Sequence, residues 1–177
     1  MTLPSSWVRD RAKNESQAFD RYRQVLQRSL GCLTRAIWLS GPPLRGSGTR
    51  RLFLSADPLE LKREAAPSLL LSASQHFHIE PWEGQYKVRT DGYIYRLASV
   101  QEPEGALLAW HWHPDVRPDP HVHANGHPDQ HIPTGRVTLE SVLAFLLADL
   151  HVKPRIAGWR ETLSQTEELH KKYRTWA

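Results

Sequence analysis

The sequence has little cysteine, no long apolar run and no internal repeat, and each absence narrows the class of protein. A single cysteine, Cys32, in 177 residues excludes an internal disulfide and any zinc finger built on cysteine ligands. No apolar run approaches the ~18 residues that span a membrane, and the N-terminal segment lacks the apolar core of a secretion signal. We therefore expect a soluble, cytoplasmic protein with no membrane partner.

The charge balance is weakly positive. The chain has 23 lysines and arginines against 19 acidic residues, a formal net charge of +4. This excess favours a nucleic-acid or acidic protein partner, but it is too small to exclude other classes. A hydrophobic content of 40% with seven tryptophans predicts a folded protein, and the length suits a single domain over 1–177.

Apolar residues recurring with a period near 3.6 predict the helices. Such stripes lie in 14–33 and in 138–150, where Thr138 is placed to cap the N-terminus, and a more polar helix is predicted over 159–176. A shorter helix is predicted over 57–67, because an Asp-Pro pair at its start suits an N-cap followed by a first helical turn.

Elsewhere the pattern alternates with a period of two and predicts strands over 35–40, 51–56, 68–80 and 106–114. It also predicts a hairpin over 84–100 that turns at Asp91-Gly92. Strands that follow one another in sequence form an antiparallel meander. We expect an α+β fold: an antiparallel β-meander sheet packed by helices, with N- and C-terminal helical extensions. Its parts are an N-terminal portion, a sheet with one helix, and a C-terminal helix, at 1–67, 68–150 and 151–177.

Six of the ten histidines lie between residues 111 and 135. They form two His-x-His pairs and two isolated positions that we expect to be loop residues: His111 with His113, His121 with His123, and then His127 and His131. Members of a pair share one face of a strand, because side chains two residues apart point the same way. Trp110 and Trp112 then point to the other face, toward the core.

One interpretation of the two pairs is metal binding. Imidazole suits zinc, copper, nickel or iron, and a carboxylate from Asp115, Asp119 or Asp129 would complete the coordination sphere. Against it, the spacing matches neither a zinc finger nor a His-Glu-x-x-His motif.

A second interpretation is acid–base cleavage of RNA without a metal. One histidine would take the 2′-OH proton and another would protonate the leaving oxygen, since the pKa of imidazole is near neutrality. Cations would stabilise the phosphate charge and a tyrosine would stack on a base. The candidates for these contacts are Arg96, Arg117, Arg136, Lys87 and Tyr95.

A third interpretation is that the histidines are ordinary polar residues. The segment is rich in proline, which is typical of a surface loop. The protein would then be a non-catalytic module that binds a protein or a nucleic acid.

Four short motifs follow one another between residues 86 and 150: Tyr93-x-Tyr95-Arg96-Leu97, Trp112-His113-Pro114, Pro120-His121-x-His123 and Thr138-Leu139-Glu140. In this order they resemble the TumE family of bacterial toxin-antitoxin proteins. The chain departs from that pattern in its long N- and C-terminal extensions and in the extended segment between the second and third motifs.

The resemblance implies a toxin component that acts on RNA and is neutralised by a co-encoded DNA-binding antitoxin, for which a helix-turn-helix protein is the candidate. Its motif positions are Arg96, His113, His121 and His123. Our leading prediction is therefore a metal-independent ribonuclease without a cofactor, in which His121 and His123 are the acid–base pair. Arg96 stabilises the phosphate, His111 and His113 border the site, and a homo-oligomer is compatible with this function.

Overall fold

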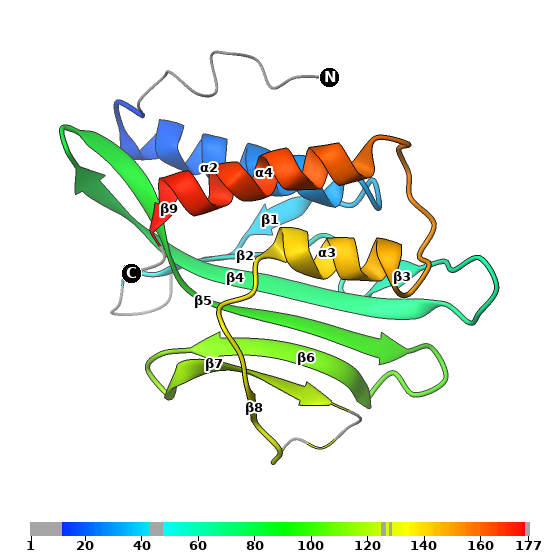
Figure 1. Cartoon of the computed structure of the whole chain (residues 1–177). Coiled ribbons are helices and arrows are strands. Elements are labelled where there is room, and N and C mark those ends of the chain that lie inside the picture. The colour runs from blue at the N-terminus through cyan, green and yellow to red at the C-terminus, as the bar shows by residue number, and fades with distance from the viewer. Residues whose placement is uncertain (1–11, 43–47, 125–126, 128, 176–177) are drawn as a thin grey trace.

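Figure 1 shows the computed structural model, which describes residues 12–42, 48–124, 127 and 129–175. The helices and strands in these ranges are α2 (Glu15–Leu30), β1 (Trp38–Ser40), β2 (Arg50–Leu54), β3 (Leu59–Leu61), β4 (Leu69–Trp82), β5 (Gln85–Ser99), β6 (Ala106–His113), β7 (Arg117–Ala124), β8 (Ile132–Pro133), α3 (Leu139–Ala148), α4 (Trp159–Tyr173) and β9 (Arg174–Thr175).

The strands form one sheet whose main order is β1-β2-β4-β5-β6-β7-β8, with β3 beside β4 and β9 beside β5. Neighbours pair antiparallel except for β5 and β9, which are parallel. From β4 to β8 each strand pairs with the next one in sequence. The predicted α+β fold with an antiparallel meander is confirmed.

The three helices lie over one face of the sheet (Figure 1). N-caps explain where two of them begin. Thr138 accepts a hydrogen bond from the backbone N–H of Ser141, as predicted, and Asn14 accepts one from that of Gln17. The apolar stripes then face inward, as at Leu26 of α2, which is fully buried. No helix in the described part of the chain is long and apolar enough to cross a membrane.

The sheet has a covered face and an open face. On β4, Leu71, Ala73 and Phe77 are buried against the helices, as the alternation predicted. His76 and His78 point to the opposite face, which the helices leave open. Buried residues from α2, the sheet, α3 and α4 form one continuous core cluster, so the helices and the sheet hold each other in place.

The helix predicted over 57–67 is wrong. Leu59–Leu61 is a short strand, β3, that pairs antiparallel with β4. Leu59 and Leu61 are buried while Glu60 between them is exposed. This is a period of two, and pairing with β4 outweighs the helix-start signal of the Asp-Pro pair.

The hairpin predicted at Asp91-Gly92 is also wrong. β5 runs unbroken through these residues, and the chain instead reverses at Glu83-Gly84, where both residues have positive φ angles of 47° and 73°. Gly92 has a different purpose, because a Cβ there would lie 2.6 Å from the backbone oxygen of Trp112 on β6. The glycine therefore permits close strand pairing rather than a turn.

Candidate metal centre

Three histidines of the 111–135 segment come together from two neighbouring strands. His111 on β6 is paired with His121 on β7, and His123 lies two residues further along β7, opposite Ala109. Side chains that are directly paired, or two residues apart on one strand, share a face of the sheet. All three imidazoles therefore project from the open face.

The tryptophans between the histidines anchor β6 on the opposite face. Trp112 is buried, and its indole N–H donates a hydrogen bond to the carbonyl of Pro118 at 3.1 Å. Trp110 packs edge-on against Phe145 of α3, with ring centroids 6.0 Å apart. The prediction that both tryptophans turn toward the core side is confirmed, and it explains why His111 must face away from the helices.

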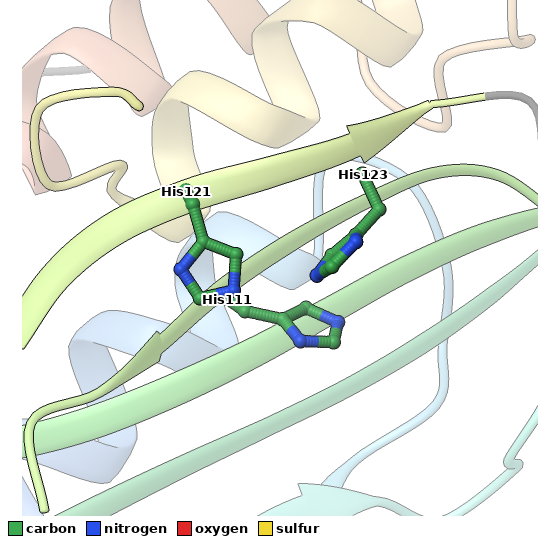
Figure 2. A group of neighbouring side chains, drawn as sticks. All are labelled: His111, His121 and His123. Carbon is green, nitrogen blue, oxygen red and sulfur yellow. The ribbon is translucent and has the colours of Figure 1, made fainter. Parts of the chain in front are cut away.

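The imidazoles of His111, His121 and His123 point toward one another (Figure 2). One ring nitrogen from each lies within 4.8 Å of those of the other two. A tetrahedral zinc ion with Zn–N bonds of ~2.0–2.1 Å places its ligand nitrogens ~3.4 Å apart. The separations of up to 4.8 Å exceed this spacing by at most ~1.4 Å, which side-chain rotations would have to close.

The orientation of His121 suits a metal ligand. This residue is 6% exposed, and its Nδ1 lies 3.0 Å from the backbone oxygen of Asp119. A carbonyl only accepts hydrogen bonds, so Nδ1 carries the proton and Nε2 keeps its lone pair for a metal. A backbone carbonyl that fixes the tautomer of a ligating histidine in this way is common in metal sites.

The electrostatics of the site favour neutral imidazoles at His111 and His113. Burial lowers the pKa of His111 to about 4, and four neighbouring histidines add to the effect. Burial, and then His121, also lower the pKa of His113. Metals bind the deprotonated ring nitrogen, so a histidine that stays neutral at physiological pH is ready to bind one.

The three histidines line a pocket on the open face of the sheet. Its walls come from β6, β7, the turn between them and the residue before β8: His111, His113, Val116, Arg117, His121, His123 and His131. The predicted carboxylate ligands do not join the histidine group among the described residues. Asp119 contributes a backbone oxygen to His121 instead of its carboxylate. The candidate ligand set is thus made of histidine alone.

No family model, curated protein or solved structure matches this chain. The resemblance to the TumE family therefore stays a prediction from the four motifs. The arrangement of the histidines is the firmer basis for a function.

Arg117 is the predicted phosphate-binding residue that lies at the pocket. Arg96 is on the same face of the sheet, but its guanidinium donates hydrogen bonds to the carbonyls of Pro103 and Glu104 at 2.7 and 2.6 Å. These carbonyls belong to the turn between β5 and β6. Arg96 therefore holds that turn, and the structure does not bring it to the histidines.

The other predicted nucleic-acid contacts lie elsewhere. Tyr95 is 1% exposed within the core, so the prediction that it stacks on a base is wrong. Lys87 makes an ion pair with Glu80 at 3.2 Å, far along the β4–β5 hairpin. The guanidinium of Arg136 lies 3.8 Å above the ring of Trp112, on the opposite side of the sheet from the pocket.

His131, expected to be a plain loop residue, is the member of the pocket that the sequence analysis missed. A signal was present: His121 and His131 each follow an aspartate at the second position before them, as Asp119-Pro-His121 and Asp129-Gln-His131. The contact that this spacing makes in space was not visible without the fold.

Proposed function

We propose that this protein binds one transition-metal ion through His111, His121 and His123 and uses it to hydrolyse a phosphodiester. The observation that carries the proposal is the approach of three imidazole nitrogens to within 4.8 Å of one another. Side-chain sets made of imidazole suit zinc, copper, nickel and iron, whereas magnesium and calcium prefer oxygen ligands.

The charge of the site points to an anionic substrate. Three neutral imidazoles leave the full double positive charge of a divalent ion uncompensated, and Arg117 adds a further positive charge at the same pocket. A zinc-type ion with three protein ligands keeps a position for water and lowers its pKa toward neutrality. A water activated in this way is a competent nucleophile toward a phosphodiester, the anionic substrate that we propose.

The remaining pocket residues have roles in this reaction. With an ion held by His111, His121 and His123, the group would supply an activated water. The water oxygen would bond to phosphorus, the bond from phosphorus to the leaving oxygen would break, and His113 would carry the released proton to that leaving oxygen. His113 lies beside His111, with ring centroids 5.6 Å apart, and outside the group of three ligands. Arg117 stabilises the charge on the phosphoryl oxygens.

The biological setting of the proposal comes from the TumE resemblance. If the resemblance holds, the phosphodiester is RNA and the partner is an antitoxin protein. The protein would then act in the cytoplasm. Expression of the wild type and of the double variant His121→Ala/His123→Ala in a bacterial host tests this setting. We expect slow growth and degraded RNA with the wild type only, and equal growth with intact RNA in both would refute it.

Zinc titration of the purified, untagged protein tests the metal centre directly. We expect about one ion per chain in the wild type and loss of tight binding in His121→Ala/His123→Ala. His127→Ala is a matched control, because His127 is an exposed histidine of the same segment that does not line the pocket. Equal binding by the double variant and the wild type would contradict the assignment.

A second candidate function is the cleavage of RNA by histidine acid–base chemistry alone. It is favoured by the rings of His121 and His123, whose centroids are 5.0 Å apart, with Arg117 at the same pocket. The two candidates differ in their response to a chelator. Activity that disappears with EDTA and returns with zinc supports the metal centre, whereas activity that EDTA leaves unchanged supports the second candidate.

A further inference from the structure

A fourth histidine, His131, lies beside the three proposed ligands, immediately before the next strand of the sheet, β8. The β7–β8 ladder pairs His121 with Pro133 and Val122 with Ile132. The same antiparallel register places His131, the residue before β8, opposite His123. Paired residues share a face, so the backbone directs His131 toward the open-face pocket.

The side chain of His131 follows that direction. The centroid of its ring lies 4.7 Å from that of His121 and 4.5 Å from that of His123. Unlike His121, it is exposed. His131 therefore covers the solvent side of the pocket.

His131 is also oriented as His121 is. Its Nδ1 lies 3.2 Å from the backbone oxygen of Asp129, two residues earlier, just as Nδ1 of His121 lies 3.0 Å from that of Asp119. In both residues the backbone carbonyl accepts a hydrogen bond from Nδ1–H, so the lone pair of the imidazole is on Nε2. The same local hydrogen bond thus orients both imidazoles so that Nε2 carries the lone pair.

We propose that His131 is a fourth ligand of the resting metal centre and that it must leave the ion before substrate can bind. This inference rests on the proposed three-histidine centre and names how that centre is regulated. A tetrahedral ion with four protein ligands has no position for water, as in structural zinc sites. The three ligands on β6 and β7 are held by the central ladder, while His131 lies exposed beside a two-residue edge strand, so it is the ligand that can exchange.

Nitrogen-15 NMR of the histidine side chains, recorded before and after addition of zinc alone, tests the ligand set without any activity assay. We expect the Nε2 resonances of His121 and His131, and one ring-nitrogen resonance each of His111 and His123, to shift on zinc binding. Comparison with the spectrum of His131→Gln assigns the fourth resonance. An unchanged His131 resonance beside three shifted ones would overturn the inference.

Zinc affinity, measured by competition with a chromophoric chelator, gives a second readout. His131→Ala should weaken zinc binding by about 10–100-fold, since loss of a direct ligand is at least as damaging as loss of an outer contact. His127→Ala should bind zinc as the wild type does. Because His131 is exposed, its replacement should leave the fold intact, and circular dichroism checks this.

The outcomes separate the two proposals. Zinc bound with wild-type affinity by His131→Ala overturns the fourth ligand and leaves the three-histidine centre standing. No zinc binding by the wild type overturns both. Weaker binding by His131→Ala together with a shifted His131 resonance supports both.

Discussion

Acid should destabilise the metal-free protein through His111. The pKa of this imidazole falls from 6.5 to about 4 on folding, first because of burial and then because of the surrounding histidines. In the unfolded chain the His111 imidazole becomes protonated below pH ~6.5, whereas in the folded protein it stays neutral down to pH ~4. Stability is therefore fully present above the unfolded pKa and is lost as the pH falls toward the folded pKa.

The size of the effect follows from the two pKa values. Between pH ~7 and pH ~5, His111 alone lowers the free energy of unfolding by about 2 kcal/mol. This figure is an upper bound, because the imidazole keeps some exposure to water. It is still a large share of the ~5–15 kcal/mol that stabilises a typical domain.

The assay is urea unfolding in EDTA, followed by tryptophan fluorescence at both pH values, for the wild type and His111→Gln. The variant should lose less stability between the two pH values than the wild type does. Most carboxylates titrate below this range, so they contribute little to the difference.

Three other histidines have pKa values that change on folding, and their contributions cancel in the comparison because both proteins contain them. Burial, and then His121, lower the pKa of His113. Burial, together with Arg51, lowers the pKa of His76. Burial opposes the charge of His78, but the hydrogen bonds that its imidazole donates to the carboxylates of Asp91 and Glu80 outweigh burial and raise its pKa. Its contribution therefore has the opposite sign. An equal loss of stability in the wild type and His111→Gln would refute the reasoning.

Three further predictions concern stability measured by chemical unfolding. Zinc at about a hundred times its dissociation constant should raise the free energy of unfolding by about 2.7 kcal/mol, while magnesium should have no effect; a wild type indifferent to zinc contradicts the metal centre. Gly92→Ala should cost about 1–3 kcal/mol, because the new Cβ would meet the Trp112 backbone oxygen at 2.6 Å, whereas Gly105→Ala, with ordinary contacts only, should be nearly neutral. Glu140→Ala should lower the free energy of unfolding by about 3–5 kcal/mol, because it removes one partner of the buried pair between Glu140 on α3 and His170 on α4, which are 3.2 Å apart. A loss below about 1 kcal/mol would show that this pair does not hold the two helices together.

The sequence by itself determined the features that depend on local periodicity. The helices at 14–33 and 138–150 were predictable because a stripe repeating near 3.6 residues and a capping side chain act within a few residues of each other. The sharing of a face by His121 and His123 was predictable for a similar reason, since alternation belongs to the strand itself. The α+β meander followed from the order of these elements.

The tertiary structure alone decided which strands pair and in which register. Gly92 lies inside a strand rather than a turn, and its lack of a Cβ makes room for a backbone oxygen on β6, a contact between distant parts of the chain. His111 meets His121 because β6 pairs with β7, and His131 joins them because β8 pairs with β7 in turn. Register is set by the packing of whole strands, which no short stretch of sequence encodes. The histidine pairs could therefore be found in the sequence, but their convergence on one point could not.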